Sequence, residues 1–219
     1  MEEFDRLIGI VKTLRSPNGC PWDREQTLES IVENIIEEAY EVVQAITEGD
    51  YEKIKEETGD LILQGVFISQ IAKEMGKFSI DEVLKDLNSK LLQRHPHVFG
   101  NEALPESTEE SLKLWETKKK ESNNILEEIP KNFPTLLYIY KVIQKSKRKG
   151  LLRFSETQLI SEISSLLLHD DILRDTEKLE DLIVFLLALL SYRNVRTEVN
   201  LREKFLKISK KWIQDCKFK

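Results

Sequence analysis

Apolar side chains recur every three or four residues along almost the whole chain, and this spacing limits the possible fold more than any other feature. The pattern gives each of a series of helices one apolar stripe. Glu, Lys, Leu and Ile dominate the composition, and only eight glycines and six prolines interrupt it. No long stretch alternates apolar and polar residues as a half-buried strand would. We therefore predict an all-α protein.

Turn-forming residues break this pattern and set the expected helix ends. The triplets Pro17-Asn18-Gly19 and Glu48-Gly49-Asp50 interrupt the apolar spacing in the first quarter of the chain. A chain of 219 residues can hold one domain or two small ones. We place a boundary at the polar stretch Ser122-Asn123-Asn124, between domains of residues 1–121 and 125–219. The approximate predicted helices are 4–14, 31–47, 51–75, 80–93, a segment from 108, 134–147, 156–168, 177–192 and 197–212.

The composition argues against several broad classes of protein. A formal charge of −6 disfavours a general nucleic-acid binder, which needs a basic surface. Cys20 and Cys216 are far apart and form no CxxC pair, so we expect two reduced thiols. The N-terminus is acidic, and the longest apolar run, residues 182–190, is too short to span a bilayer. We expect a cytoplasmic protein whose partners include no membrane and no nucleic-acid polymer.

Two acidic clusters occur on consecutive predicted helices. Glu37 and Glu38 precede Glu41 in the first helix, and Glu57 precedes Asp60 by three residues in the second. Side chains three or four residues apart share one face of a helix. The turn between the helices lets them run antiparallel, which would bring the two clusters together. Converging carboxylates repel one another strongly unless a divalent cation neutralises them.

The apolar surface beside these acids favours a metal site over a solvated, salt-bridged surface. Glu38 is expected to lie beside the apolar stripe of its helix, with Glu41 further round and Glu37 further still. Asp60 lies where the second helix changes from polar to apolar. A lone Glu-x-x-Glu pair is most often a pair of surface acids, but two pairs on adjacent helices indicate a metal site. The predicted stripe of the first helix is Ile31, Ile35, Ala39, Val42 and Ile46.

Carboxylate ligands without cysteine or well-placed histidine suit a hard cation, with Mg²⁺ as the first choice and Mn²⁺ as its substitute. Magnesium commonly completes its coordination with substrate phosphates, and Trp22 or Trp115 offers a face for a base. The combination predicts metal-assisted hydrolysis of a nucleotide phosphoanhydride. The sequence has no glycine-rich P-loop, and neither cluster supplies the histidine of a di-iron bundle. The cations that could hold phosphates are Lys53, Lys90, Arg94 and Lys119.

Simpler explanations exist for several of these residues. A loop tryptophan such as Trp22 is more often a packing plug than a ligand contact. Lys90 and Arg94 could neutralise a helix C-terminus. In His95-Pro96-His97 the proline prevents helical ligand spacing, so we expect no metal there. The whole chain could also be a non-catalytic nucleotide- or protein-binding helical module in stress regulation.

Several motifs in residues 1–121 occur in an order that is typical of one protein family. They are Leu14-Arg15 with Gly19-Cys20-Pro21-Trp22-Asp23-x-x-Gln26-Thr27, Glu37-Glu38-Ala39-Tyr40-Glu41-Val42-Val43, Glu57-x-Gly59-Asp60-Leu61 and Arg94-His95-Pro96-His97-Val98-Phe99. With these motifs the chain resembles the MazG nucleoside triphosphate pyrophosphohydrolases. The resemblance implies all-α domains that dimerise into helical bundles. It also implies Mg²⁺-dependent hydrolysis of nucleoside triphosphates to monophosphate and pyrophosphate, which would clean aberrant or surplus nucleotides from the pool.

The resemblance assigns a role to each candidate residue. Glu38, Glu41, Glu57 and Asp60 would be the metal ligands, and Glu37 would support them or orient water. Glu37 and Glu38 are thus the candidate catalytic residues. The family's nucleotide contacts fall at Lys53, Lys90, Arg94, Trp115 and Lys119, to which we add Trp22.

Residues 125–219 weakly resemble a second domain of the same kind. The segment from Asp50 to Ile54 is similar in sequence to residues 175–179, and each segment leads into a long apolar helix. The acid pair of this copy, however, reads Glu162-x-x-Ser165, and no Glu-x-x-Asp pair is intact near Glu180. We therefore predict two tandem MazG-like helical domains, each dimerising into a bundle. Catalysis is expected in the first domain, whereas the second packs, dimerises or regulates.

Overall fold

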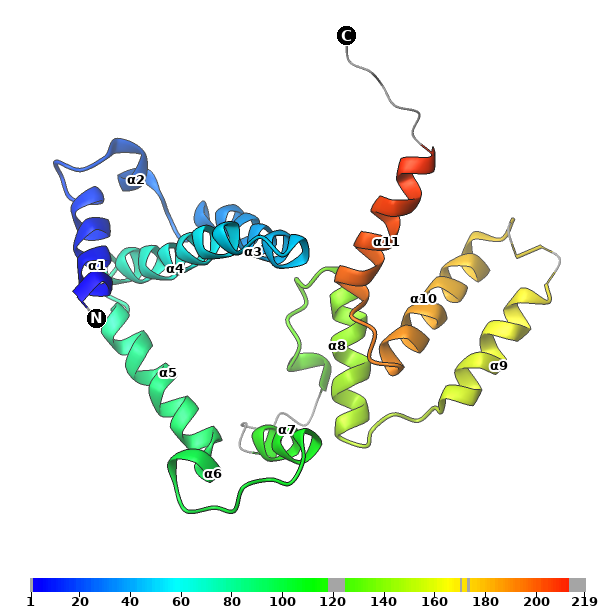
Figure 1. Cartoon of the computed structure of the whole chain (residues 1–219). Coiled ribbons are helices and arrows are strands. Elements are labelled where there is room, and N and C mark those ends of the chain that lie inside the picture. Colours follow the sequence, from blue (N-terminus) through cyan, green and yellow to red (C-terminus); the bar gives the residue numbers. More distant parts are fainter. Residues whose placement is uncertain (1, 118–124, 170, 173, 213–219) are drawn as a thin grey trace, which may run out of the picture. The chain divides into compact units, whose positions relative to one another are not determined.

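The computed structural model describes residues 2–117, 125–169, 171–172 and 174–212, and every regular element within these ranges is a helix (Figure 1). This confirms the all-α prediction, and no long helix begins or ends more than two residues from its expected position. The elements are α1 (Glu2–Leu14), α2 (Pro21–Glu25), α3 (Ile31–Glu48), α4 (Tyr51–Glu74), α5 (Ile80–Arg94), α6 (Pro96–Phe99), α7 (Thr108–Thr117), the 3₁₀ helix η1 (Ile125–Glu127), α8 (Thr135–Arg148), α9 (Glu156–Leu167), α10 (Thr176–Tyr192) and α11 (Thr197–Trp212).

The chain divides into two compact units, Met1–Pro105 and Glu106–Lys219. Helices α1 to α6 belong to the first unit, and α7 to α11 belong to the second. The stretch Ser122-Asn123-Asn124, where we expect the domain boundary, lies outside the described residues, as do Lys119 and Cys216. Along the described part of the chain, no helix is both long and apolar enough to cross a membrane.

The first unit is built on an antiparallel hairpin of α3 and α4, against which α1 packs (Figure 1). Its apolar core joins α1 to the start of α3 and to the second half of α4. Burial of such side chains is the main source of folding free energy. The acids of α3 and α4 lie nearer the turn of the hairpin than these core positions do. The buried core residues are Val11, Ile31, Val66, Phe67 and Ile71.

Local signals at the turn explain why the two helices reverse direction there. Gly49 ends α3 in the left-handed conformation with φ 71°, which glycine adopts without steric cost. Asp50 then caps α4, because its carboxylate accepts hydrogen bonds from the backbone N–H groups of Glu52 and Lys53 at 3.1 and 3.2 Å. Only Gly49 and Asp50 separate α3 from α4, so the two helices lie side by side.

The segment between α1 and α3 differs from the predicted loop, because Pro21–Glu25 forms the short helix α2. Proline at the first helical position supplies the φ that a helix needs. Arg15 fixes this segment: it donates hydrogen bonds to the backbone oxygens of Asp23 and Gln26, and its other nitrogens pair with Glu74 of α4. Contacts distant in sequence therefore stabilise a helix that is too short to persist alone.

The predicted apolar stripe of α3 is wrong at one position. Ile46 is 59% exposed, whereas its neighbour Ala45 is 1% exposed. The physical reason is that α3 is packed within this chain along the side that faces α4, so that a second apolar stripe remains exposed. This outer stripe consists of Val32, Ile36, Val43 and Ile46.

The second unit contains a hairpin of α9 and α10 packed on α8, with α11 also against α8. Its apolar clusters include Ile143, Leu159 and Ala188. The segment before α8 is fixed by Glu128, whose side chain is only 10% exposed and pairs with Lys145 of α8 and with Lys149, the residue that follows this helix. These two ammonium groups lower the pKa of Glu128 to about 2.

Candidate metal site between α3 and α4

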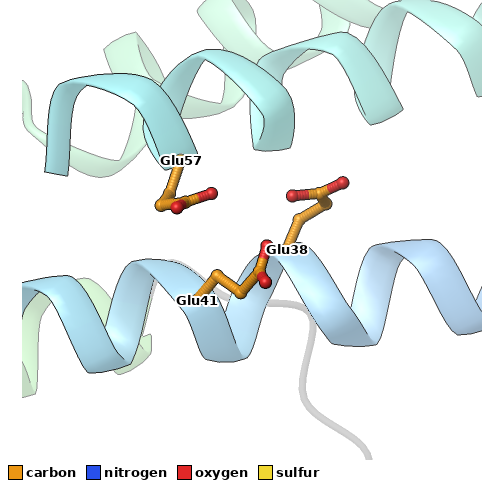
Figure 2. A group of neighbouring side chains, drawn as sticks. All are labelled: Glu38, Glu41 and Glu57. Carbon is orange, nitrogen blue, oxygen red and sulfur yellow. The ribbon is translucent and has the colours of Figure 1, made fainter. Parts of the chain in front are cut away.

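Three glutamates from the two helices converge at the centre of the hairpin. Glu38 and Glu41 extend from α3, and Glu57 extends toward them from α4 (Figure 2). One carboxylate oxygen of each lies within 4.8 Å of the others. Among the described residues, this is the one group of three or more acidic, histidine or cysteine side chains with such spacing. The hairpin thus brings together two acidic clusters that are about one helix length apart in sequence.

The remaining two predicted acids lie around this group. Asp60 follows Glu57 by three residues on the same face of α4, and it is near enough to raise the pKa of both Glu38 and Glu57. Its oxygens are not part of the close group of three. Glu38 is half-buried, whereas Glu41 and Glu37 are exposed, which agrees with the expectation that Glu38 lies nearest the apolar stripe of α3.

The electrostatics of the site disfavour its full negative charge. Partial burial raises the pKa of Glu38, and the charges of Asp60 and Glu41 raise it further. Partial burial also raises the pKa of Glu57, with the charges of Glu41 and Glu56 next in importance. Both causes destabilise the ionised carboxylates. A bound cation would remove this cost, because opposite charge close to a carboxylate favours its ionised form.

Sequence reasoning missed one polar residue at the site. Gln64 is 7% exposed, and its amide Nε2 donates to Oε1 of Glu38 at 3.4 Å. The Oε1 atom of Gln64 is buried and has no hydrogen-bond partner among the described residues. A signal was present in the sequence: Gln64 interrupts the apolar run of α4, four residues after Asp60 and seven after Glu57, and hence on their face of the helix.

These side chains fit a hard divalent cation. The close group consists of carboxylates alone, and oxygen ligands without sulphur or imidazole suit Mg²⁺ or Mn²⁺. The half-buried position between two helices also removes part of the competing water. Glu38, Glu41 and Glu57 could each supply an oxygen, and Asp60 is the next nearest carboxylate along the face of α4.

Three of the four predicted phosphate-binding cations lie on two helices of the first unit. Lys53 is exposed on α4, four residues before Glu57 and therefore on the same face. Its ammonium group lies 3.4 Å from a carboxylate oxygen of Glu48. Lys90 is exposed and Arg94 is half-buried, both at the end of α5. Neither belongs to the helix pair that carries the acids.

The predicted aromatic contacts are divided between the two units. Trp22 of α2 is 58% exposed, so its ring is not packed into the core of this chain. Trp115 is half-buried on α7 in the second unit. Lys119 lies outside the described residues, and its role stays a prediction.

The second unit repeats the cap that begins α4 but not the acids that follow it. Asp175 caps α10 by accepting from the N–H groups of Glu177 and Lys178 at 3.1 and 3.2 Å, the same distances as in the cap of α4. The residues seven and ten positions after this cap are Leu182 and Phe185, where α4 carries Glu57 and Asp60. Phe185 and Glu162 of α9 line an open, largely apolar pocket of about 520 Å³.

Comparison with known proteins places the chain in a family. Residues 26–99 match the MazG nucleotide pyrophosphohydrolase domain. The chain is 38% identical over 209 residues to the nucleoside triphosphate pyrophosphohydrolase/pyrophosphatase MazG of Thermotoga maritima, a match that covers 91% of this chain and 80% of that protein. It is also 38% identical over 156 residues to the nucleoside triphosphate pyrophosphohydrolase of Escherichia coli K12, with 68% of this chain and 59% of the relative covered.

One solved structure is also similar. The crystal structure of a mazG-related protein from Thermotoga maritima is 29% identical in sequence, with a TM-score of 0.46, and the match covers 53% of this chain and 99% of that one. The family match and the relative from the same organism carry the assignment. The chain therefore belongs to the MazG nucleotide pyrophosphohydrolase family.

Proposed function

We propose that this protein hydrolyses nucleoside triphosphates to nucleoside monophosphate and pyrophosphate, with Mg²⁺ or Mn²⁺ as cofactor. The observation that carries the proposal is the convergence of Glu38, Glu41 and Glu57 within 4.8 Å, in a chain whose relatives bear the name nucleoside triphosphate pyrophosphohydrolase. We further propose that the reaction removes aberrant or surplus nucleotides from the pool.

Each predicted residue has a distinct task in this proposal. Glu38, Glu41 and Glu57, with Asp60, hold the metal ion, which when bound neutralises phosphoryl oxygens and activates water. Glu37 is exposed next to Glu38, and its task in this proposal is to support the metal ligands or to orient the attacking water.

Binding and orientation of the substrate fall to the basic and aromatic residues. Lys53 projects from the face of α4 that carries Glu57, so its ammonium group can donate to a phosphate oxygen beside the metal site. Lys90 and Arg94 offer further donors on α5. The exposed ring of Trp22 offers a stacking face for the base. Trp115 and Lys119 complete the proposed contacts on the basis of the family resemblance.

The reaction products test this proposal directly. The full chain is incubated with a mixture of nucleoside triphosphates and Mg²⁺, and products are separated by anion-exchange chromatography. We expect monophosphate and pyrophosphate in equal amounts; diphosphate with orthophosphate would contradict the proposal. Tight binding without turnover in either metal would favour the alternative of a non-catalytic nucleotide-binding module.

Two matched variants test which unit carries the catalytic site. Glu38→Gln removes a charge from the acid group, and Glu180→Gln makes the same change at an exposed residue of α10. We expect the first to lower kcat/KM at least a hundredfold, because a metal ligand is lost, and the second to leave it unchanged. Full activity of Glu38→Gln together with loss of activity in Glu180→Gln would move the catalytic site to the second unit.

We also propose that the protein is a homodimer. The outer stripe of α3 leaves Ile36 53% exposed, and α5 exposes Val83, Leu87 and Leu91 at helical spacing. Exposed apolar stripes of this kind are typical of an association surface, and a second copy presents the same stripes for symmetric packing. Light scattering after gel filtration should give twice the monomer mass of 25.6 kDa. Ile36→Glu with Val43→Glu should give the monomer mass, while a monomeric wild-type protein would refute the proposal.

A further inference from the structure

Gln64 and His97 are the described residues with a buried side-chain atom that lacks a hydrogen-bond partner, and Gln64 is the more buried of the two. Its side chain is 7% exposed within an otherwise apolar part of α4. Its Nε2 donates to Glu38 at 3.4 Å. Its Oε1 is buried without a hydrogen-bond partner among the described residues. An unpaired buried carbonyl costs about 1–3 kcal/mol, so a leucine at this position would be the more stabilising choice for packing alone.

The surroundings of this oxygen narrow the choice of partner. Gln64 lies on the same face of α4 as Glu57 and Asp60, and its amide reaches Glu38. Ionised carboxylates are acceptors only and cannot satisfy a carbonyl oxygen. The missing partner must therefore bring an O–H or N–H donor to the acid group. A water molecule held among the carboxylates has this chemistry, and buried waters typically make about three hydrogen bonds to such groups.

We propose that Gln64 is a positioning residue of the metal site. Its Nε2 fixes the carboxylate of Glu38, and its Oε1 accepts a hydrogen bond from a water molecule that is held at the site when the cation is bound. The inference rests on the metal-binding part of the proposed function. Residues that orient ligands in this way typically change metal affinity 10- to 100-fold when they are replaced.

The first measurement is metal affinity, independent of turnover. Mn²⁺ binding to the full-length protein is followed by electron paramagnetic resonance and by calorimetry, for wild type, Gln64→Leu and Gln64→Glu. We expect Gln64→Leu to weaken binding 10- to 100-fold. The matched control is Gln70→Leu, because Gln70 lies on the same helix and donates to a glutamate outside the site, Glu74, at 2.9 Å.

The second measurement is thermal unfolding of the metal-free proteins in EDTA. We expect Gln64→Leu to unfold at the same or a higher temperature than wild type, because the unpaired oxygen is removed, even though its Mn²⁺ affinity falls. A merely structural role for Gln64 predicts a lower unfolding temperature with unchanged affinity. Gln64→Glu keeps an acceptor but loses the donor. Unlike Gln64→Leu, it should unfold at a lower temperature than wild type in EDTA, because its charge adds repulsion with Glu38.

The outcomes separate this inference from the proposed function. Unchanged Mn²⁺ affinity in Gln64→Leu, or an equal loss in Gln70→Leu, overturns the role of Gln64. Metal binding by the wild-type protein without hydrolysis of any nucleoside triphosphate overturns the proposed function alone and leaves the affinity test valid. A wild-type protein that binds no Mn²⁺ overturns both.

Discussion

Replacing Glu38 by glutamine should have opposite effects on stability in the absence and presence of metal. One oxygen of Glu38 lies within 4.8 Å of oxygens of Glu41 and Glu57. Two unit charges at that distance repel by about 0.9 kcal/mol in water and by about 3.5 kcal/mol at an effective dielectric constant of 20. Because these side chains are only partly buried, the value near that of water applies. The neutral amide should therefore stabilise the metal-free protein by about 1 kcal/mol.

Bound metal should reverse the order of stability of wild type and Glu38→Gln. At a metal concentration one hundred times its Kd, binding stabilises the wild-type protein by about 2.7 kcal/mol. Glu38→Gln lacks one charged ligand and should lose most of this gain. The variant is thus expected to be the more stable protein in EDTA and the less stable one in saturating Mg²⁺. The amide oxygen of the new glutamine can still accept a hydrogen bond from Gln64. The substitution Glu38→Gln therefore tests the charge of the side chain more than its packing.

Thermal unfolding followed by circular dichroism measures both halves of this prediction. A stabilisation of about 1 kcal/mol should raise the Tm of a unit of this size by about 4 °C in EDTA. Glu180→Gln is the control and should behave as wild type in both buffers. A lower Tm of Glu38→Gln in EDTA would show that the ionised carboxylate is favourable in the metal-free fold. An undiminished Mg²⁺ response would show that Glu38 does not bind the metal. Either result would refute the electrostatic reasoning.

Three further predictions concern pH and two structural ion pairs. The pKa values of Glu38 and Glu57 are raised in the folded state. The metal-free protein should therefore gain stability from these groups as pH falls through their raised pKa values. Calorimetry should show Mg²⁺ affinity falling over the same pH range. Glu128→Gln leaves Lys145 buried without its partner and should destabilise the second unit by about 3 kcal/mol, measured by urea unfolding. In wild type the stabilisation by Glu128 is complete above pH 4.5 and should be lost as pH falls toward 2. A second unit that keeps its full stability in acid would contradict this prediction. Arg15→Lys loses the guanidinium fork that joins α2 to α4 and should cost about 1–3 kcal/mol; proteolysis between α1 and α3 should accelerate, and unchanged cleavage would argue against this anchoring role.

The helices could be predicted from the sequence because their ends depend on local chemistry. Gly49 and Asp50 end one helix and begin the next with backbone conformations and caps that involve only neighbouring residues. Ser79 likewise caps α5 through a reciprocal hydrogen-bond pair with Glu82. The error at Ile46 has a different origin. An apolar spacing shows which faces of a helix are apolar, but it does not show which of them a neighbouring helix will cover.

The contacts that anchor α2 also could not be predicted from the sequence. Arg15 joins the backbone of Asp23 and Gln26 to Glu74, which is 59 residues away along the chain. No periodicity or motif encodes such a contact, because it depends on where α1 and α4 lie in space. The exposure of Trp22 depends on the same contacts, since they set the direction of the short helix that carries it.

The sequence alone determined that the chain is all-helical and that its acids lie in two clusters on consecutive helices, because helical spacing and turn chemistry act over a few residues. Only the tertiary structure decided which carboxylate oxygens come close together. Packing of α3 against α4 brings Glu38, Glu41 and Glu57 within 4.8 Å and leaves Asp60 outside this close group. It also buries Gln64 against Glu38, because the relative rotation of two packed helices is fixed by all their side chains together and by no single motif.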